Sequence, residues 1–552
     1  MKQKNLRYLL LFFLFLALPA LACGFGGGDE ESRIPRNAAV VNVLASSSLE
    51  PWLTMAASDF NASEQKTESG RPIFVQLDTA ESGQAVIDLA ANSQETSLWI
   101  PESNLWVDML TDRGNPAYAE DCSSIAESPL VIGMWRSVAE SLGWPGLPLG
   151  WLDIGSLAAD PSAWAYYSGG EFGDSLRMSH AHPGLSGAGS STLLAIVQAA
   201  QSKTEAVTAE DISEPIVQAS VGAFESAVSS FNSNSENLGK TMAERGPDYL
   251  DAGVMYESTI VQNGNGDLVA IYPLEGTYMA THPACINQTA DEETIEAAAI
   301  FRDYLLSETG QEQALAAGLR PINSAVAIGS PLDEAHGVDP SQPEIIFNEP
   351  EVNTVYAVQD LWQAARKPVN LVMLLDTSGS MRGSKIESMK EAAEEFIQNM
   401  GDEDTISLIE FYTEIDLLVD HASVGRDRQL AIEAIQGLEQ GGDTSLFDAI
   451  GAGAQLIQSE ANPDTVNAIV VLTDGMDTSS SRFRFDNNLI AAATAGDTTV
   501  FTIAYGNDAD NELLSELAAR GNGNFYLGDE ASIATIYEEM SAAFGGTLGV
   551  GR

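Results

Sequence analysis

The stretch that decides the fold is Val369-Asn-Leu-Val-Met-Leu-Leu-Asp376-Thr-Ser378-Gly-Ser380-Met381. Its apolar run is long enough for a buried strand and stops at an aspartate, and two hydroxyl side chains follow two and four residues later. Apolar residues then recur at helical spacing from Ser384 to Met400. A strand, a loop and a helix in this order place three oxygen ligands at the carboxyl end of a sheet, where open α/β folds bind their ligands. Hard divalent cations prefer such all-oxygen surroundings.

Two later stretches complete a pattern with the first. Gly441-Gly-Asp-Thr444-Ser-Leu-Phe-Asp-Ala carries a hydroxyl on a glycine-rich loop before a helix, and Ala468-Ile-Val-Val-Leu-Thr-Asp474-Gly475 is a second apolar strand that ends in an aspartate. Together the three stretches resemble the metal-ion-dependent adhesion site (MIDAS) of von Willebrand factor A-type (VWA) domains. The resemblance covers roughly residues 367–546 and implies a doubly wound, mainly parallel, six-stranded sheet in which the two aspartate-bearing strands are neighbours.

The resemblance also implies a set of metal ligands. Ser378, Ser380 and Thr444 would coordinate the ion directly, and Asp376 and Asp474 would bind it directly or through water. Mg²⁺ suits small hydroxyls plus water, and Mn²⁺ or Ca²⁺ could substitute. In the family, a carboxylate of a protein or surface partner fills the remaining position. The alternative interpretation is a set of polar loops that only cap helices and bind no partner.

Size and charge set broad limits. The chain has 552 residues and a net charge of −53, so several domains are expected. So strong a negative field repels phosphate backbones, which argues against nucleic acid as a partner.

The first residues predict export. A basic start with Lys2, Lys4 and Arg7 precedes an apolar run that is too short to span a bilayer comfortably. The sequence Pro19-Ala-Leu-Ala-Cys23 follows and resembles a bacterial lipoprotein signal, which predicts a signal peptide at 1–22, lipidation of Cys23, a flexible tether at 23–37 and an extracytoplasmic protein anchored to the cell membrane. An ordinary secretory signal cleaved nearby is the alternative.

Strands and helices alternate from Ala38 onward, which favours βαβ units and a mainly parallel sheet. The region is similar to bacterial extracytoplasmic solute-binding proteins in several segments: Ser46-Ser-Ser, Ser82-Gly-Gln, Trp99-Ile-Pro-Glu-Ser, Ser128-Pro-Leu-Val-Ile-Gly-Met, the run from His180 to Leu193, Ala270-Ile-Tyr-Pro-Leu-Glu-Gly-Thr and Gly318-Leu-Arg-Pro. The resemblance implies a two-lobed periplasmic-binding-protein-like module (type II) at 38–345. Lobe I would span about 38–130 and 272–345, lobe II about 131–271, and 346–366 would be a linker.

A ligand site in this module has a physical basis. The pairs Ser82-Gly83 and Ser190-Ser191 are expected at helix starts, where free backbone N–H groups can hold an anion. Ser46 and Ser47 could add hydroxyls, so two helix ends facing across a cleft predict a site for a small solute or oxyanion. The alternative is that these residues only cap their helices.

Two cysteines remain, Cys122 and Cys285. Outside the cytoplasm a single pair commonly forms a disulfide, and two buried free thiols are the alternative. Both cysteines lie near the expected crossings between the lobes, at about 128–134 and 272–286, which supports pairing.

These features predict a lipid-anchored recognition or adhesion protein that captures a protein or surface ligand through the metal. The alternative is a transporter-type solute receptor whose VWA domain only mediates docking. No Gly-x-Ser-x-Gly elbow or zinc motif occurs, so no enzyme is expected.

Overall fold

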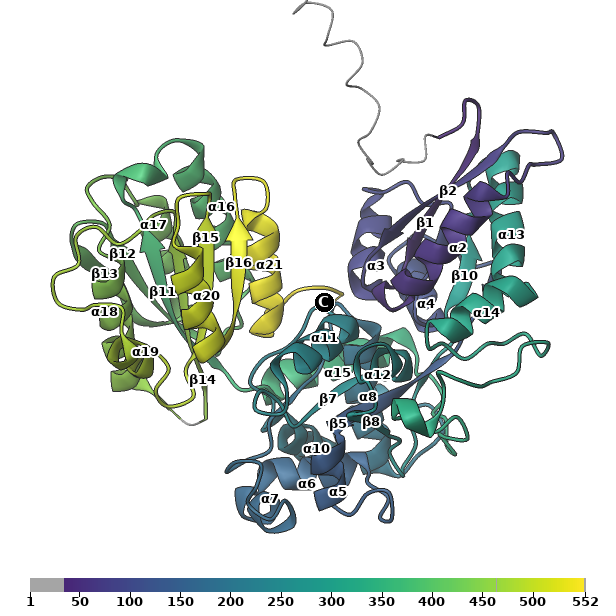
Figure 1. Cartoon of the computed structure of the whole chain (residues 1–552), viewed down its shortest axis with the longest axis horizontal. Coiled ribbons are helices and arrows are strands. Elements are labelled where there is room, and N and C mark those ends of the chain that lie inside the picture. The colour runs from purple at the N-terminus through teal and green to yellow at the C-terminus, as the bar shows by residue number, and fades with distance from the viewer. Residues whose placement is uncertain (1–33, 463, 551–552) are drawn as a thin grey trace, which may run out of the picture.

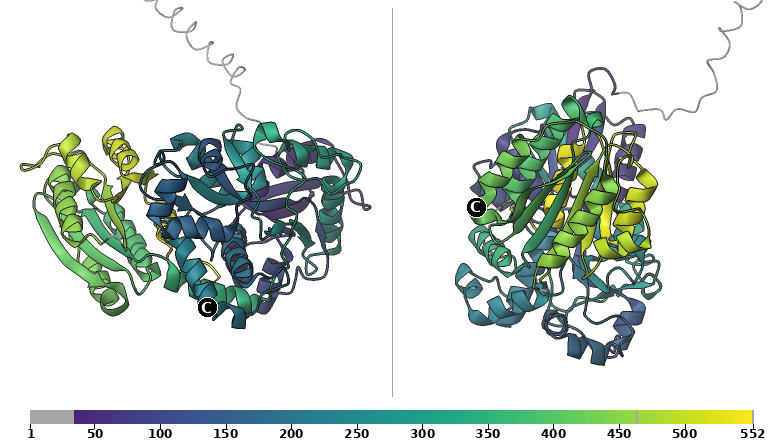
Figure 2. Two further views of the ribbon diagram at one scale, coloured as in Figure 1. Left: turned by 90° about the horizontal axis from the view of Figure 1, so that it is seen from below. Right: turned by 90° about the vertical axis from the view of Figure 1, so that its left-hand side faces the viewer.

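The computed structural model describes residues 34–462 and 464–550. Cys23, the predicted signal peptide and most of the predicted tether lie outside these residues. The chain forms a two-lobed module with a third α/β body beside it (Figures 1 and 2), which confirms the predicted fold class. Within the described ranges, no helix combines the length and the apolar character that crossing a membrane requires.

Lobe I is built on a five-stranded sheet with the strand order β2-β1-β3-β10-β4. Strand β1 runs parallel to β2 and β3, whereas β10 is antiparallel to β3 and β4. The elements of this lobe are β1 (Ala39–Ala45), η1 (Ser47–Leu49), α2 (Glu50–Ala62), β2 (Ile73–Thr79), α3 (Ser82–Ala91), β3 (Leu98–Ile100), α4 (Asn104–Asp112), β4 (Cys122–Ser124), β10 (Pro283–Ile286), α13 (Glu292–Leu306) and α14 (Glu308–Ala316). Because β10 returns from far along the chain to the middle of the sheet, lobe I needs both chain segments.

Lobe II has the strand order β6-β7-β5-β8, and β9 pairs with the start of β5. Its elements are β5 (Ser128–Trp135), α5 (Arg136–Ser141), α6 (Trp151–Ala159), α7 (Pro161–Tyr167), β6 (Met178–Ser179), α8 (Gly187–Gln201), α9 (Ala209–Ile212), α10 (Pro215–Glu225), α11 (Ser235–Arg245), β7 (Ala252–Tyr256), α12 (Glu257–Asn263), β8 (Leu268–Ile271) and β9 (Met279–Ala280). The apolar helix α8 is almost wholly buried, which explains why its sequence reads as apolar on every side.

The prediction assigned the segment after residue 320 to lobe I, but in the structure part of this segment packs on lobe II. Leu332 and Val338 are buried in a core of lobe II, and the Ala270 N–H donates to the Gly337 carbonyl at 2.8 Å. The segment around η2 (Glu334–His336) therefore covers lobe II rather than lobe I. The predicted linker is also structured, because α15 (Val352–Ala365) packs Val355 and Trp362 into the same large core as α8 and α10.

Cys122 and Cys285 are joined by a disulfide. They face each other in the register of the antiparallel strands β4 and β10. The bond ties the segment before the first crossing to the segment after the second.

The third body has the strand order β13-β12-β11-β14-β15-β16, in which only β13 is antiparallel to its neighbour. Its elements are β11 (Val369–Asp376), η3 (Gly379–Met381), α16 (Ser384–Asn399), β12 (Thr405–Phe411), β13 (Ile415–Ser423), α17 (Val424–Gln436), α18 (Leu446–Glu460), β14 (Val466–Thr473), α19 (Asn487–Ala493), β15 (Thr499–Tyr505), α20 (Asn511–Arg520), β16 (Asn522–Gly528) and α21 (Ile533–Ala543). The prediction that β11 and β14 are neighbours is confirmed.

Every residue of β11 is buried because helices cover both faces of the sheet. Successive side chains of a strand point to opposite faces. Accordingly, Leu371 and Met373 share a core with α16, α17 and α21, whereas Val372 and Leu374 share one with α18, α19 and α20. This arrangement places the carboxyl ends of β11 and β14 at the open edge of a doubly wound sheet.

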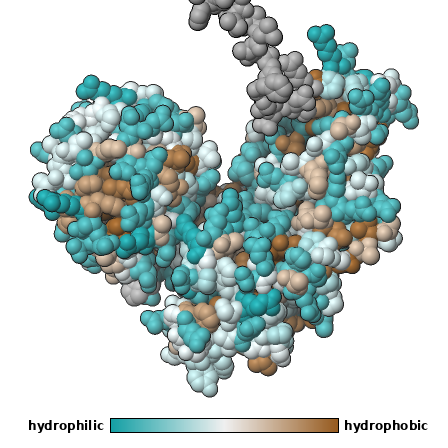
Figure 3. Space-filling model, in the orientation of Figure 1, coloured by the Kyte–Doolittle hydropathy of each residue, from teal (hydrophilic) through white to brown (hydrophobic). Residues whose placement is uncertain are grey.

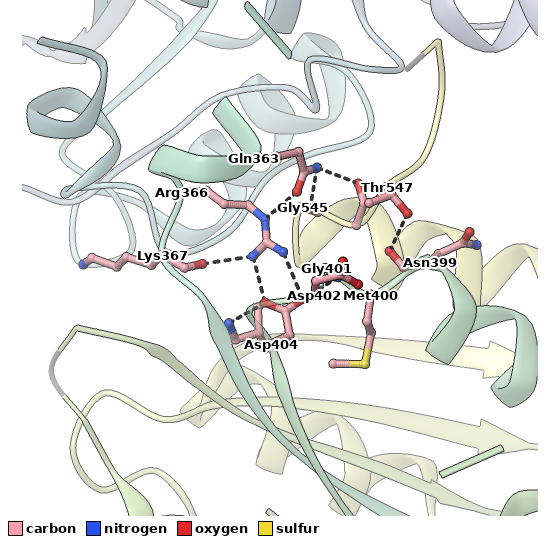
Figure 4. Close-up of polar contacts among 12 residues, drawn as sticks. Gln363, Arg366, Lys367, Asn399, Met400, Gly401, Asp402, Asp404, Gly545 and Thr547 are labelled. Atoms are coloured by element: carbon pink, nitrogen blue, oxygen red, sulfur yellow. Dashed lines mark hydrogen bonds and ion pairs between the residues drawn. The ribbon is translucent and has the colours of Figure 1, made fainter. Parts of the chain in front are cut away.

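The junction between the two-lobed module and the third body is polar and buried (Figure 4). The Arg366 guanidinium, just after α15, binds both oxygens of Asp404 at 3.1 and 2.9 Å, and both side chains are at most 3% exposed. Asp404 also accepts N–H groups of Val369 and Gly401. The segment that joins α15 to β11 is thereby fixed to the loop before β12.

A second connection is made by residues 545–550, which we call the strap. The strap follows α21 and runs toward lobe II (Figure 1). His182 Nε2 contacts the Gly546 carbonyl at 2.8 Å, and the Val550 N–H donates to the Gly184 carbonyl at 2.9 Å. Val550 is fully buried within the core of the two-lobed module, so the end of the VWA-like body is packed into lobe II.

Candidate metal centre and inter-lobe cleft

Asp376 lies at the end of β11 and is fully buried. Its Oδ1 accepts the Ser378 N–H at 2.8 Å, and its Oδ2 accepts the Thr473 hydroxyl at 2.5 Å. Burial raises the pKa of Asp376, the bonds from Thr473 and Ser378 lower it part of the way back, and the charge of Asp474 raises it again. The carboxylate is therefore held by neutral hydrogen-bond donors, and no cationic side chain of the described residues forms an ion pair with it.

The other predicted ligands converge on the same place. Ser378 Oγ and Ser380 Oγ lie 3.0 Å apart, and Ser380 Oγ donates to Asp474 Oδ1 at 2.6 Å. Thr444 reaches the group from its own loop: a Cβ placed on Gly475 would lie 3.5 Å from Thr444 Oγ1 and 3.8 Å from Ser380 Oγ. The structure thus brings all five predicted side chains together at the ends of β11 and β14.

Backbone hydrogen bonds tie the Thr444 loop to the first loop. The Gly441 N–H donates to the Thr377 carbonyl at 2.8 Å, and the Gly379 N–H donates to the Gly442 carbonyl at 3.1 Å. Gly442 has φ +74°, a backbone conformation that residues other than glycine rarely adopt. The glycine-rich sequence therefore serves the close approach of two loops.

Lys385 is a feature of this centre that the sequence analysis missed. Its Nζ lies 2.5 Å from Asp474 Oδ2, and its side chain is only 26% exposed. It comes from the first turn of α16, one residue after the helix begins. Within the described residues, Lys385 is thus the only cationic side chain that forms an ion pair with either of the two central aspartates, and it pairs with Asp474.

The donor set fits a hard divalent cation. Two carboxylates and three hydroxyls supply only oxygen atoms, and such ligands favour Mg²⁺, Mn²⁺ or Ca²⁺ over softer metals. In residues 34–462 and 464–550, the candidate centre included, no group of three or more His, Cys, Asp or Glu side chains is placed to hold a metal ion. The candidate centre relies on hydroxyls for most of its ligands.

The inter-lobe cleft holds the residues predicted for solute binding, with one difference. Ser82 and Gly83 open α3, and Ser46 and Ser47 lie at the start of η1. Helix α8, however, begins at Gly187, so the Ser190 N–H already donates to the Ser186 carbonyl at 3.0 Å and the Ser190 hydroxyl donates to the Pro183 carbonyl. Ser190 and Ser191 therefore do not provide the free N–H groups of this helix start, because the helix begins three residues earlier than predicted.

Three glutamates that the sequence analysis did not select lie at this cleft: Glu102 is buried, and Glu81 and Glu236 are partly buried. Glu102 accepts hydroxyl hydrogens from Ser46 at 3.2 Å and from Ser82. The Ser47 hydroxyl contacts both Glu81, from lobe I, and Glu236, from lobe II, the latter at 3.2 Å.

Burial raises the pKa of all three carboxyl groups, that of Glu102 to about 7. Among the described residues, no lysine or arginine forms an ion pair with any of the three. The Trp99-Ile-Pro-Glu-Ser segment was the only sequence signal that pointed toward Glu102.

Two family models match the chain. The model for bacterial extracellular solute-binding proteins matches residues 41–320, about half of the chain, and the model for the von Willebrand factor type A domain matches residues 370–539. These matches define a class of binding protein in which a two-lobed module precedes a VWA domain. The chain belongs to the bacterial extracellular solute-binding protein family and carries a VWA domain after that module.

Curated relatives match a smaller part. The Synechocystis protein sll0103 is 30% identical over 161 residues, which cover 29% of this chain and 37% of that protein. The human inter-alpha-trypsin inhibitor heavy chain H4 is 30% identical over 166 residues, covering 28% of this chain and 18% of that protein. The chain therefore spans well under half the length of these relatives.

Solved structures resemble each half. The periplasmic binding protein AfuA from Actinobacillus pleuropneumoniae covers 59% of this chain and 96% of its own at 15% identity, with a TM-score of 0.42. A von Willebrand factor type A protein from Catenulispora acidiphila covers 32% of this chain and 42% of its own at 22% identity, with a TM-score of 0.29.

Proposed function

We propose that this chain is a lipid-anchored, extracytoplasmic recognition protein that captures a protein or surface ligand through a divalent cation in its VWA domain. The observation that carries the proposal is the convergence of three hydroxyls and two buried carboxylates from three separate loops at one sheet edge. We further propose that the chain is not an enzyme and that Mg²⁺, or Mn²⁺ or Ca²⁺ in its place, is the cofactor.

The five residues would have two roles, metal coordination and charge balance. Ser378, Ser380 and Thr444 would hold the ion with hydroxyl oxygens, while Asp376 and Asp474 would balance its charge. The bound ion would supply a Lewis-acidic position for a carboxylate of the partner. Thr473 orients Asp376 through its hydroxyl, and hydrogen bonds of this kind fix a ligand in the geometry that binding requires.

A pull-down of surface proteins with the full chain tests this proposal. Partners should be retained in Mg²⁺ or Mn²⁺ and lost when a chelator is added, and Asp376→Ala should lose them in both conditions. The matched control is Asp443→Ala, because Asp443 is an exposed carboxylate on the Thr444 loop that lies outside the proposed ligand set. Equal retention by wild type, Asp376→Ala and the chelated sample would contradict metal-dependent capture.

The membrane anchor is a separate part of the proposal, and it rests on the sequence around Cys23. Two acyl chains would anchor the protein stably, whereas one would hold it only marginally. Growth with labelled palmitate should mark the wild-type chain and not Cys23→Ala. Label in both proteins would contradict lipidation at Cys23.

A transporter-type solute receptor is the second candidate function, and membership of the solute-binding family over half of the chain favours it. In that case the two-lobed module binds a small solute and the VWA domain docks it to other surface proteins. Native mass spectrometry of the full chain would detect a co-purified solute as an added mass, which denaturation removes. An unliganded mass under conditions that keep the fold intact would count against this candidate.

We also propose that the two parts influence each other through the strap. The strap bonds to His182 and Gly184, in the loop that leads directly into α8 at the cleft. A change in the closure of the lobes would therefore move groups bonded to the end of the VWA domain. Unchanged partner affinity in a variant with a released strap would contradict this coupling.

A further inference from the structure

Two helix starts meet where the lobes close. Helix α3 of lobe I and helix α8 of lobe II contain 10 and 15 residues, and such helix starts carry free N–H groups that favour anions. Across the seam, the Gly83 N–H donates to the Leu185 carbonyl at 2.7 Å, and a Cβ on Gly83 would lie only 2.6 Å from that oxygen. The lobes therefore touch through backbone at this point, and a side chain at position 83 would hold them apart.

The carboxyl group of Glu102 lies in front of the α8 start. A Cβ on Gly187, the first residue of α8, would lie 2.7 Å from Glu102 Cδ and 2.9 Å from its Oε2. The Ser82 hydroxyl, at the first residue of α3, donates to the same Oε2, and Ser46 reaches Oε1. Glu102 belongs to lobe I, yet its side chain fills the space that an anion between the two helix starts would take.

The backbone of Glu102 is equally fixed. Its carbonyl accepts the N–H groups of Thr281 and His282 at 2.9 and 3.1 Å, where the chain returns to lobe I. The residue is only 2% exposed. Its backbone position is therefore set by the second chain crossing.

A buried hydroxyl at the α8 start adds an independent sign of an anion site. Ser186 precedes α8 and is 1% exposed, yet its Oγ makes no hydrogen bond within the described residues. It lies close enough to Glu81 to lower the pKa of that carboxyl group, although burial and the neighbouring carboxylates raise the pKa overall. The α8 start thus presents hydroxyl and backbone donors to carboxyl groups of lobe I.

We propose that the cleft is a carboxylate-binding site occupied by the chain's own Glu102, so that the two-lobed module is closed without a free solute. Glu81, Glu236 and the phenol of Tyr256 face the same seam. Two further carboxyl groups beside the site repel an incoming oxyanion whenever they are ionised. The wild-type cleft therefore takes an internal ligand, and a free carboxylate enters only when that ligand is removed.

Chemical rescue tests the proposal on the full chain. In Glu102→Ala, formate or acetate should bind in the space left by the side chain and raise the melting temperature of the two-lobed module. The expected affinity is at least about tenfold tighter than for wild type. Glu102→Gln is the matched control, because its amide keeps the shape and most hydrogen bonds and leaves no space, so formate should not change its melting temperature.

Two results would overturn the proposal. One is formate stabilisation of wild type and Glu102→Gln to the same extent as Glu102→Ala; the other is a folded Glu102→Ala protein that formate and acetate leave unchanged. If Glu102→Ala does not fold, calorimetry on wild type decides instead. Sulfate, phosphate, formate and acetate should give no binding heat, and saturable binding of any of them would show that the cleft is free to accept an anion.

Discussion

The candidate metal centre of the VWA domain and the seam between the lobes both gather side-chain oxygens at strand ends and helix starts. At the candidate metal centre, acceptors dominate: two buried carboxylates meet three hydroxyls, and a lysine on α16 forms the only ion pair with either carboxylate among the described residues. At the seam, carboxyl groups meet hydroxyl donors and the start of α8. In our proposals, the first arrangement takes a cation, whereas the second is already occupied by an acid of the chain itself.

Similar residue types at two sites therefore do not mean that the two sites bind the same kind of ligand. Serines and acids build both places, and the orientation of donors and acceptors decides what each can accept. The surface in Figure 3 is largely hydrophilic, in accord with a net charge of −53. Such a field favours cations at an open metal centre and disfavours free anions in the cleft.

Loss of a direct ligand should have the largest effect on this contrast. Asp376→Ala should weaken Mn²⁺ binding to the full chain by more than about 100-fold, because a charged oxygen ligand is removed. Titration calorimetry measures the change. Glu102→Gln should bind Mn²⁺ as wild type does, and equal affinities for wild type and Asp376→Ala would remove Asp376 from the centre.

Loss of the group that orients this ligand should have a smaller effect. Thr473→Val keeps the shape of the side chain but removes the hydroxyl that donates to Asp376 Oδ2. Metal affinity should fall by roughly 10- to 100-fold. Thr502→Val is a control in the same sheet, because the Thr502 hydroxyl donates to the Leu514 carbonyl away from the centre; a similar loss in both variants would mean that only stability had changed.

The contribution of the strap to stability can be tested by a substitution at one of its glycines, Gly549. Gly549 has φ +86°, and an added Cβ would collide with the Gly184 carbonyl. Gly549→Ala should therefore release the strap and lower the melting temperature. Gly70→Ala is the matched control, because Gly70 has φ +88° and no atom within 4 Å of the added Cβ.

Backbone strain from a side chain in the left-handed region costs roughly 1–2 kcal/mol, and Gly70→Ala should show only that effect. A larger decrease in Gly549→Ala would be the signature of lost strap contacts. Equal decreases in the two variants would mean that the strap contributes nothing to stability.

The smallest effect concerns pH. Because burial raises the pKa of Glu102 from 4.5 to about 7, the folded state binds more protons than the unfolded state between these values. The free energy of unfolding of the two-lobed module should therefore decrease as pH rises through this window. Glu102→Gln cannot titrate, so its stability should fall less steeply, and parallel pH profiles would contradict the burial of an ionisable group at this position.

The sequence predicted the fold well because its signals were local. The apolar run of β11, its aspartate and the following hydroxyls lie within a few residues of each other, and the order of strands and helices followed from periodicity. The five predicted metal ligands come from three such local segments. Their convergence follows from the topology of a doubly wound sheet.

What the sequence did not reveal depends on contacts between distant segments. Ser47 and Glu236 are 189 residues apart in the chain, and His182 and Gly546 are 364 apart. Neither contact leaves a periodic pattern, since each depends on how the lobes close or how the bodies dock. The helix start at Gly187 was missed for a simpler reason: glycines and alanine at the start of α8 resemble a loop.

Anomalous diffraction from crystals soaked in Mn²⁺ is the decisive measurement for the proposed cation site. We predict a single strong peak among Ser378, Ser380, Thr444, Asp376 and Asp474, with the Lys385 ammonium displaced from Asp474. No peak at this position at saturating Mn²⁺, with Lys385 still paired to Asp474, would contradict it.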